Sequence, residues 1–565
     1  MFLPTTREEM QKLGWDGLDI ILVTGDTYID SPYIGAAVIG NLLASKDYRV
    51  GVIAQPDVNS EADITRLGEP QLFWGITGGS VDSLVANFTA SGKRRGRDDM
   101  TPGGVNDKRP DRACIAYANL IRRYFKETRP LVLGGIEASL RRVAHYDYWN
   151  DDIRRSILFD AKADILVYGM AEKTILELAG KIRKAEDFRA VKGLCYIAKE
   201  PKVDYVQLPS YEETVADKNK FTEMFHLLYK NNDPLTAKGL CQRQDTRYLV
   251  QNPPSASLTP PELDHIFDLD YERDVHPYYK KQGPVKALET IRFSLTTHRG
   301  CYGECNFCSI TVHQGRTVIS RSEGSIIKEA EAITKLPGFK GYILDVGGPT
   351  ANMYDIECAT KLKSGSCENK RCLFPKKCRH LPVDHRKQVQ LLQKISRLPG
   401  VKKVFVASGI RYDMVLDDEK YGREYLREIV SHHVSGQLKI APEHSEDKVL
   451  RAMGKPGADY LKAFRLIFNQ LNKEENRKQF LTYYLIAAHP GCELEDMKKL
   501  KRFASQELKV TPEQVQVFTP LPSTYSSLMY YTGADPFTGR PLFVEKDAGN
   551  RERQKYAVIG VHKGK

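Results

Sequence analysis

The sequence predicts an α/β protein in which a doubly wound parallel sheet is followed by a six-stranded β/α barrel. Short apolar segments alternate with amphipathic segments along both halves of the chain, and small or polar residues follow the apolar segments. This alternation is typical of parallel strands joined by crossover helices. The length of 565 residues suits about three to four domains, or two domains with a long connector.

The first predicted domain, residues 1–200, carries the doubly wound sheet. Strands are expected at residues 17–23, 48–54, 71–76, 130–135 and 163–169, and helices at 33–44 and 173–184. Doubly wound folds bind ligands beyond the ends of their strands, although tight turns alone would also account for the glycines found there. These glycines are Gly25, Gly78, Gly79, Gly134, Gly135 and Gly169.

Residues 201–288 are predicted to be a connector with one or two helices. Their periodicity is poor, and prolines, which interrupt helices and strands, are frequent. The clustered prolines are Pro253, Pro254, Pro260, Pro261, Pro277 and Pro284.

Residues 289–532 are predicted to form the barrel, and residues 533–565 a polar, basic, peripheral tail. In a β/α barrel the active site forms at the carboxyl ends of the strands. The expected strands are 291–297, 341–346, 403–408, 438–441, 482–488 and 514–519, and the helices between them are 323–336, 386–398, 421–432, 459–471 and 493–508.

The composition is that of an ordinary globular protein, with 41% hydrophobic and 28% charged residues. Wholesale disorder, collagen and coiled coil are therefore excluded. The formal net charge of +12 is small for this length and permits RNA or an anionic substrate without favouring either. No apolar run approaches the roughly 20 residues of a membrane span, and the N-terminus lacks a signal-peptide pattern. We expect a cytoplasmic protein with no membrane association.

The eleven cysteines are concentrated, with seven of them between positions 301 and 378. An odd number of cysteines in a large chain without an export signal favours metal binding or thiolate chemistry over disulfides. Just after the first barrel strand, Cys301, Cys305 and Cys308 form a CxxxCxxC motif. Three thiolates can bind three irons of a [4Fe–4S] cluster and leave the fourth iron open. A three-cysteine zinc site completed by a distant residue is the alternative.

This triad resembles the signature of the radical S-adenosylmethionine (SAM) superfamily, CxxxCxΦC, in which Phe307 would be the aromatic residue. The resemblance implies a Rossmann-like doubly wound domain followed by a partial (β/α)6 radical SAM barrel. It also implies that the open iron chelates SAM, that an electron from a donor such as flavodoxin or ferredoxin cleaves the cofactor reductively, and that the resulting 5′-deoxyadenosyl radical acts on a substrate. The segments GWDGLDIILVTGDTYID, GGIEASLRRVAHYDYW, GGPTANMY and LKIAPEH resemble the YgiQ-like family over nearly the whole chain; that family implies no particular substrate.

The resemblance also implies contacts to SAM. Gly347 and Gly348 lie where the superfamily has a Gly-Gly-Glu motif for the methionine amino group, with Pro349 in place of the glutamate. Ser408 and Arg411 lie where members bind the carboxylate, and Glu443 where a polar residue meets the ribose. Each of these residues could instead serve a turn or a surface ion pair. Acid–base groups at the same mouth could be His298, His444 and His489.

A second cysteine set, Cys358, Cys367, Cys372 and Cys378, lies in an insertion spanning residues 358–380. Four thiolates suit a closed site, either structural zinc or an auxiliary iron–sulfur cluster. Basic residues in the insertion could offset the negative charge of such a site, or they could contact RNA. A metal-bearing protein that binds or modifies RNA is therefore the alternative function. The basic residues are Lys361, Lys363, Lys370, Arg371, Lys376, Lys377 and Arg379.

The N-terminal domain resembles the Rossmann-like cobalamin domain that precedes many radical SAM barrels, through GGIEAS and ADILVYGMAEKTILEL. In those proteins a DxHxxG motif supplies the histidine that ligates cobalt. The comparable stretch here runs from Asp30 to Gly35 and has Pro32 in the position of the histidine. Cobalamin is therefore not expected to bind, and the alternative is that it binds without a protein ligand to cobalt.

Overall fold

The computed structural model describes residues 1–368 and 370–559 and divides into two compact units. Unit 1 comprises Met1–Thr89, Lys93–Leu258 and His265–Arg292, and unit 2 comprises Ala90–Gly92, Thr259–Asp264 and Phe293–Lys565. Each unit has a hydrophobic core of its own. Within the described residues, no helix has the length and apolar character that crossing a membrane requires.

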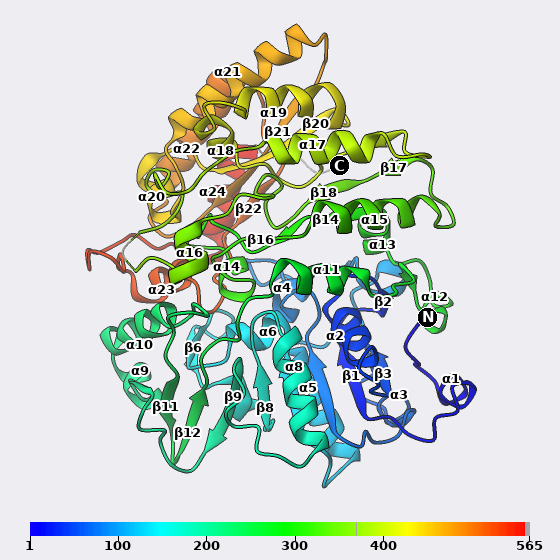
Figure 1. Cartoon of the computed structure of the whole chain (residues 1–565). Helices are drawn as coiled ribbons and strands as arrows, with labels where there is room; N and C mark the ends of the chain where they lie inside the picture. The colour runs from blue at the N-terminus through cyan, green and yellow to red at the C-terminus, as the bar shows by residue number, and fades with distance from the viewer. Residues whose placement is uncertain (369, 560–565) are drawn as a thin grey trace. The chain divides into compact units, whose positions relative to one another are not determined.

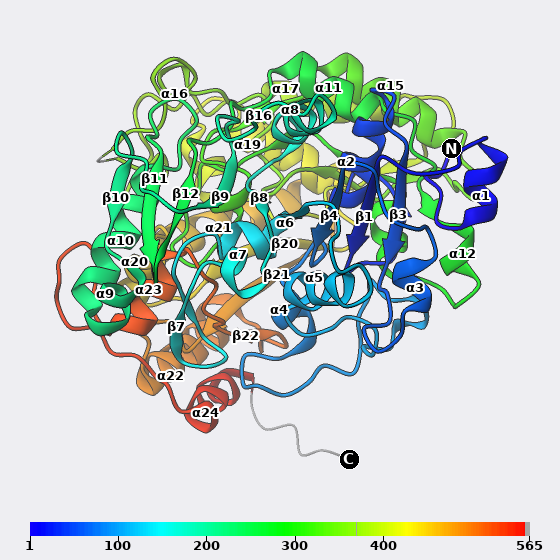
Figure 2. The same ribbon diagram turned by 90° about the horizontal axis from the view of Figure 1, so that it is seen from below.

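Unit 1 is built on one nine-stranded sheet with the strand order β10-β11-β12-β9-β8-β5-β4-β1-β3 (Figure 2). The five strands from β8 to β3 in this order are parallel. The central strand β1 is buried along its whole length, which is typical of a strand covered on both faces. These five strands are β1 (Ile20–Thr24), β3 (Val50–Ala54), β4 (Phe73–Thr77), β5 (Leu131–Gly134) and β8 (Ile165–Val167).

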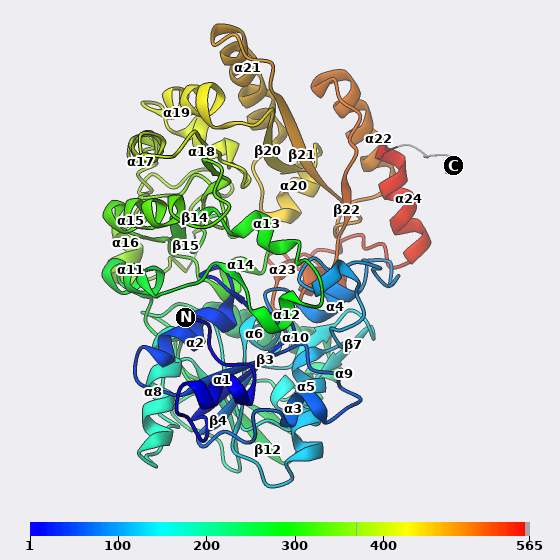
Figure 3. The ribbon, with the colours of Figure 1, turned by 90° about the vertical axis from the view of Figure 1, so that its right-hand side faces the viewer.

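Helices cover both faces of this sheet, as the doubly wound prediction requires (Figure 3). One face carries α2 (Gly35–Ala44) and α8 (Glu172–Arg183), and the other carries α3 (Ala62–Thr65) and α5 (Ala113–Tyr124). The predicted α/β class is confirmed for this unit. Its remaining helices are α1 (Arg7–Lys12), α4 (Ser83–Asn87), α6 (Gly135–Leu140), α7 (Ile157–Asp160), α9 (Tyr211–Ala216), α10 (Lys218–Lys230), α12 (Pro277–Lys280) and α13 (Ala287–Ile291).

Much of the predicted connector belongs to the sheet of unit 1. After β9 (Leu194–Ala198), strands β10 (Val206–Leu208), β11 (Leu240–Gln244) and β12 (Arg247–Gln251) extend the sheet, with β12 antiparallel to both β9 and β11. Strands β11 and β12 lack the apolar pattern that predicts a buried strand, because their inward positions include the buried amides of Gln242, Gln244 and Gln251. The residues after β12 do lack strands until β13 (Asp274–Val275), and α11 (Pro260–Asp268) lies among them.

In its described residues, unit 2 contains six parallel strand positions in chain order, as predicted for a partial barrel; Figure 1 shows their arrangement. Strand β14 pairs with β18, β17 with β19, and β21 with both β20 and β22. A parallel bridge between Ile410 and Ile440 connects the third position to the fourth. The strands are β14 (Ser294–Thr296), β17 (Tyr342–Ile343) with β18 (Asp345–Gly347), β19 (Lys403–Val404), β20 (Gln437–Glu443), β21 (Phe480–Ala487) and β22 (Val515–Val517).

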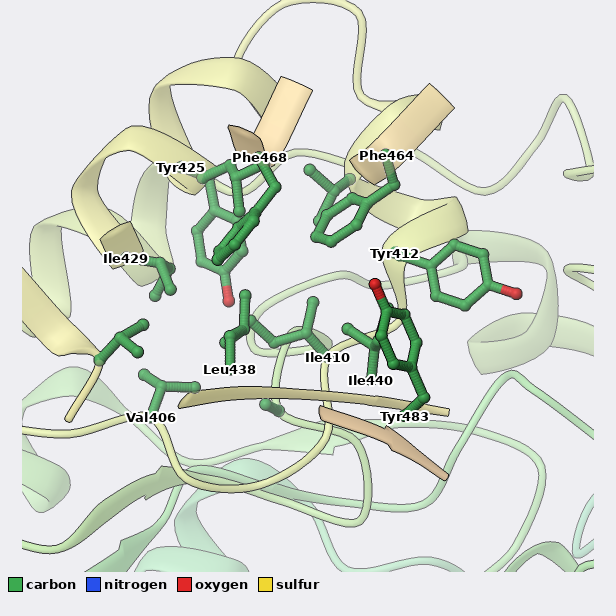
Figure 4. Close-up of a cluster of buried hydrophobic side chains, with 14 of the residues drawn as sticks. Val406, Ile410, Tyr412, Tyr425, Ile429, Leu438, Ile440, Phe464, Phe468 and Tyr483 are labelled. Atoms are coloured by element: carbon green, nitrogen blue, oxygen red, sulfur yellow. The ribbon is translucent and has the colours of Figure 1, made fainter. Parts of the chain in front are cut away.

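A helix follows each of the first five strand positions and covers the outside of the sheet. Figure 4 shows Phe464 and Phe468 of α21 above Leu438 and Ile440 of β20, with Tyr412 and other apolar side chains around them. These contacts hold the fourth strand against the helices that flank it. The helices are α15 (Glu323–Thr334), α17 (Arg386–Ser396), α18 (Tyr412–Asp417), α19 (Gly422–Glu428) continued by η2 (Ile429–His433), α20 (Asp447–Met453), α21 (Ala458–Glu474) and α22 (Leu494–Phe503) continued by η3 (Ala504–Leu508).

The predicted tail contains a packed helix, α24 (Ala548–Ile559), beside α22 and β22 (Figure 3). Arg551, Gln554 and Val558 are buried at a helical spacing, but two of these three residues are polar, so no apolar stripe marks the helix in the sequence. Arg551 donates hydrogen bonds to the carbonyl oxygens of Phe518 and of Ala90, a residue of unit 2 that lies early in the chain. The last part of the predicted tail, residues 560–565, lies outside the described residues.

Candidate functional site

The CxxxCxxC loop follows the first barrel strand, between β15 (His298–Arg299) and α14 (Ile310–His313). Cys301 is buried, and Cys305 and Cys308 are half-buried. A Cβ atom on Gly303 would lie 3.2 Å from Cys301 Sγ and 3.6 Å from Cys305 Sγ, so both sulfurs lie on one side of the loop. The loop is at the carboxyl end of its strand, where β/α barrels place their active sites.

Polar groups contact two of the three sulfurs. The Gly303 amide donates to Cys301 Sγ at 3.3 Å, and the Thr350 hydroxyl lies 3.5 Å from the same atom. Arg411 Nη1 donates to Cys305 Sγ at 3.5 Å. Burial raises the pKa of the Cys301 thiol, and it raises that of Cys308 to about 12. A positive charge at the sulfurs, such as that of bound iron, would favour the thiolate forms that bind metal.

The triad has the donor set that a [4Fe–4S] cluster requires. Each thiolate of such a cluster binds its own iron, so the three sulfurs need not converge on one point. Across residues 1–368 and 370–559, no group of three or more His, Cys, Asp or Glu side chains is arranged around a single metal ion.

Arg411 reaches the loop from the start of α18, where Asp413 holds its guanidinium. Arg411 Nε donates to Asp413 Oδ1 at 2.9 Å, and Nη2 donates to Asp413 Oδ2. Burial works against the charged form of Arg411, but Asp413 raises the pKa of the guanidinium well above its usual value. Three of its five N–H groups thus contact Asp413 and Cys305, and a further ligand can take the others.

The backbone of Arg411 is fixed by Asn352, which follows the second strand. Asn352 Oδ1 accepts from the Arg411 amide at 2.8 Å, and Asn352 Nδ2 donates to the Arg411 carbonyl at 3.1 Å. Asn352 Nδ2 also lies 3.1 Å from His385 Nε2, and His385 Nδ1 lies 2.8 Å from Asp418 Oδ2. Nothing in the spacing of Asn352, His385, Asp413 and Asp418 indicates a common partner, so these residues could not be predicted from the sequence.

The predicted SAM contacts of the second and third strands lie close together. Gly347 packs against Ala351 and Ser408, and a Cβ atom on Gly348 would lie 2.6 Å from the His298 ring, so glycine is required there. The Ser408 hydroxyl donates to Asp345 Oδ2, and the Ser408 amide donates to Asp345 Oδ1 at 3.1 Å. Ser408 is thus held by a carboxylate of the neighbouring strand, which the sequence did not indicate.

Glu443 ends β20 at an irregularity in the pairing with β21. Its φ of 68° lies in the left-handed region, a conformation that costs about 1–3 kcal/mol for a non-glycine residue and is often found at functional sites. Burial raises the pKa of the Glu443 carboxyl, and Lys455, whose Nζ lies 3.9 Å from Oε1, partly opposes this. The side chain is thus held near the end of the fourth strand.

The three histidines at the strand ends are buried and neutral. Burial lowers the pKa of His298 and of His444 to about 4 each, and that of His489 to about 3. His489 Nε2 lies 2.7 Å from Ser526 Oγ, and His444 Nε2 lies 3.4 Å from Met497 Sδ. At neutral pH these imidazoles carry no charge, so of the acid–base roles predicted for them this state suits a base and disfavours an acid.

The structure brings three of the four cysteines of the second set together. Cys358, Cys372 and Cys378 are buried in one cluster with Cys301 and Tyr302, whereas Cys367 is exposed. Burial raises the pKa of Cys372 to about 12, and a hydrogen bond from Lys361 opposes this rise.

Basic residues of the insertion make contacts inside unit 2. Lys361 is buried and donates to Glu304 Oε1 at 3.2 Å. Arg371 donates to the Glu304 carbonyl and lies over the rings of Tyr525 and Phe537, and Lys377 donates to the Asp417 carbonyl. Lys361 is thus paired with a carboxylate, whereas Arg371 and Lys377 contact carbonyl oxygens or aromatic rings. Both interpretations of the insertion stay predictions.

The glycines at the strand ends of unit 1 make room for charged side chains. A Cβ atom on Gly79, whose φ is +106°, would collide with Asp26, and one on Gly78 would collide with Glu137. Arg109 donates to the Gly78 carbonyl at 2.7 Å, to Asp26 Oδ1 at 2.8 Å and to Asp98 Oδ2 at 3.0 Å. This edge of the sheet therefore contains a buried ionic cluster.

The barrel and its cysteine loop have the architecture of a radical SAM protein, and comparison with known families agrees. The family model "Radical SAM N-terminal" matches residues 2–294. The UPF0313 protein FN0734 of Fusobacterium nucleatum is 59% identical over the full length of both chains, and the UPF0313 protein of Thermotoga maritima is 48% identical over the full length of both. The chain belongs to the UPF0313 family of radical SAM proteins, and it is an enzyme of that class. The predicted superfamily is confirmed.

Among solved structures, the radical SAM methyltransferase TsrM from Kitasatospora setae, with cobalamin and a [4Fe–4S] cluster bound, is similar to this chain. The TM-score is 0.51 at 15% sequence identity, over 90% of this chain and 74% of that one. This likeness shows a shared α/β fold.

The expectation that cobalamin does not bind is wrong, because TsrM, which shares this fold, has cobalamin bound. The expectation rested on Pro32, and a missing histidine removes only one ligand of cobalt. Asp30 of the same segment accepts hydrogen bonds from Asn41 Nδ2 at 2.7 Å and from the Glu272 amide at 2.8 Å. This segment therefore contributes hydrogen bonds to the interior of unit 1. Its sequence does not determine whether the fold binds cobalamin.

Proposed function

We propose that the chain binds a [4Fe–4S] cluster through Cys301, Cys305 and Cys308 and cleaves SAM reductively, so that a 5′-deoxyadenosyl radical acts on a substrate. The observation that carries the proposal is the set of polar groups around the triad. A backbone amide, a hydroxyl and a guanidinium contact two of its sulfurs at 3.3–3.5 Å. Donors of this kind stabilise thiolates that bind a metal cluster, and they are the usual outer partners of such ligands.

A bound cluster would pass one electron from a donor such as flavodoxin or ferredoxin to the sulfonium of SAM, which breaks the bond from sulfur to the 5′ carbon and leaves methionine. The chain's own residues would bind SAM and orient it. The backbone of Gly347 and Gly348 approaches the SAM amino group, and Arg411 offers N–H groups to the carboxylate. The Ser408 hydroxyl donates its hydrogen to Asp345 Oδ2, so its oxygen would accept from the SAM amino group instead of donating to the carboxylate as the resemblance implied. Glu443 would accept from a ribose hydroxyl.

The variant Cys305→Ala tests this proposal. We expect the variant to keep the far-ultraviolet circular dichroism of the wild type and to form no 5′-deoxyadenosine from SAM and dithionite after anaerobic reconstitution with iron and sulfide. The matched control is Cys241→Ala, which removes a buried thiol from β11 of unit 1 and should leave both iron content and cleavage unchanged. Cleavage that persists in Cys305→Ala would exclude the proposal.

We further propose that Cys358, Cys372 and Cys378 bind an auxiliary iron–sulfur cluster, in which each thiolate would bind its own iron. Their burial among the same side chains supports this, and their sulfurs do not surround a single point as a zinc ion would require. Metal analysis of reconstituted protein separates this cluster from the structural zinc site that the sequence also allowed. About four irons with one zinc would assign a structural zinc site, and about eight irons would assign an auxiliary cluster. About four irons without zinc would contradict a second metal.

A further inference from the structure

The guanidinium of Arg411 is held in a single orientation beside the cysteine loop. Its two bonds to Asp413 use the parallel, two-point geometry that is strongest for arginine and carboxylate. The side chains of Arg411 and Asp413 are 8% and 4% exposed, so water competes little for the pair. An arginine does not lose its proton in a protein, and the positive charge is therefore permanent.

The backbone that carries this guanidinium is fixed as firmly. Asn352 exchanges two hydrogen bonds with the amide and the carbonyl of Arg411. Asn352 is in turn fixed by His385, which contacts Asp418 and stacks on the Tyr425 ring with a centroid distance of 4.5 Å. Every member of this chain of contacts lies in unit 2, so the geometry does not depend on the other unit.

The guanidinium is aimed at a sulfur, and the loop is shaped to admit it. Arg411 Nη1 lies 3.5 Å from Cys305 Sγ. A Cβ atom on Gly303 would lie 2.7 Å from the same Nη1, which is too close for any side chain. The φ of Gly303 is not in the left-handed region, so the glycine is required by the approach of the arginine and not by the backbone conformation.

A fixed cation at a cluster sulfur favours the reduced cluster. Reduction adds one negative charge to the cluster and its thiolates, and a nearby positive charge stabilises the more negative state, more strongly in a buried site than in water. Hydrogen bonds to the sulfurs are among the features that set the potentials of iron–sulfur clusters. We infer that the positive charge of Arg411, which Asp413 holds in orientation, raises the reduction potential of the cluster bound by the triad. This inference rests on the proposed function.

The test is a redox titration of the reconstituted full-length chain, without SAM, followed by electron paramagnetic resonance of the reduced cluster. Dithionite or titanium(III) citrate supplies the single electron. In Arg411→Gln we expect at least a tenfold lower ratio of reduced to oxidised cluster at a fixed solution potential, which is a downward shift of about 59 mV for one electron. The matched control is Arg371→Gln, because Arg371 contacts the same loop at the Glu304 carbonyl and no sulfur.

The outcomes separate this inference from the proposed function. The inference is supported if Arg411→Gln keeps the wild-type iron content and lowers the reduction potential of the cluster, while Arg371→Gln leaves that potential unchanged. An unchanged potential, or an equal shift in Arg371→Gln, overturns it while leaving the cluster in place. If Arg411→Gln does not retain iron, Asp413→Asn decides. This change removes the negative counter-charge and keeps an amide oxygen for the guanidinium, so the potential should rise, and an unchanged or lowered value overturns the inference. A wild-type chain that binds no iron would instead contradict the proposed function itself.

Discussion

Acid should destabilise unit 2 through His298, the histidine that packs against Gly348. Burial lowers the pKa of His298 from 6.5 to about 4, whereas in the unfolded chain a histidine titrates near 6.5. Between these two values the unfolded state holds a proton that the folded state does not. The free energy of unfolding therefore has its full value above about pH 6.5, and it falls as the pH decreases towards 4.

The size of the effect follows from the interval between the two pKa values. One proton changes the free energy of unfolding by about 1.36 kcal/mol per pH unit, so the interval of His298 amounts to about 3 kcal/mol. His444 and His489, with pKa values lowered by burial to about 4 and about 3, add to the same slope. Together the three histidines give a slope of about 4 kcal/mol per pH unit, and His298→Asn should remove about a third of it.

The assay is urea unfolding at pH 7.5, 6.0 and 5.0, followed by two signals. All three tryptophans, Trp15, Trp74 and Trp149, lie in unit 1, so their fluorescence reports unit 1 and circular dichroism reports both units. His298→Asn should flatten the pH dependence in the dichroism alone. His432→Asn is the control, because His432 is exposed and water reaches its ring in the folded state. Equal slopes in His298→Asn and the wild type would refute the reasoning.

Two further substitutions test the packing of each unit. Arg109→Met leaves the buried carboxylates of Asp26 and Asp98 without their cation; we expect a loss of about 3–5 kcal/mol in the urea unfolding seen by tryptophan fluorescence, and a loss below about 1 kcal/mol would contradict a stabilising role for the pair. Phe464→Ala removes a fully buried ring that packs on Tyr412 and Phe468; we expect a loss of about 3–5 kcal/mol in the unfolding seen by circular dichroism, and an unchanged midpoint would show that the neighbouring side chains refill the space.

The fold was predictable where burial leaves a mark in the sequence. Strand β1 is covered on both faces and therefore reads as an unbroken apolar run. Strands β11 and β12 escaped prediction because their inward amides find partners in the folded protein. In β11, Gln244 Nε2 donates to Gln242 Oε1 at 2.9 Å, and in β12, Gln251 Oε1 accepts from Arg142 at 3.0 Å. A buried polar residue with a partner is stable, but the partner cannot be recognised before the chain is folded.

The same limit applies to the site. The spacing of the three cysteines marked the loop, because thiols this close in sequence can face one ligand whatever the rest of the fold does. The sequence also indicated Arg411, but not what holds it. Asn352 is separated from Arg411 by 59 positions, and only the adjacency of the second and third strands brings them together. Asp413 is two residues from Arg411, yet only the turn into α18 directs it at the guanidinium.

The contact of Arg551 with Ala90 affects how the protein folds during its synthesis. Their separation is 461 positions, and at about 5–20 residues per second the ribosome needs between about 20 and 90 s to bridge them. The last residues of unit 1 end at Arg292, so that unit can fold long before α24 is synthesised. Unit 2 must wait for α24 to leave the ribosome before Arg551 can bind the Ala90 carbonyl. A chain that ended before α24 would therefore have a finished first unit and a second unit without this contact.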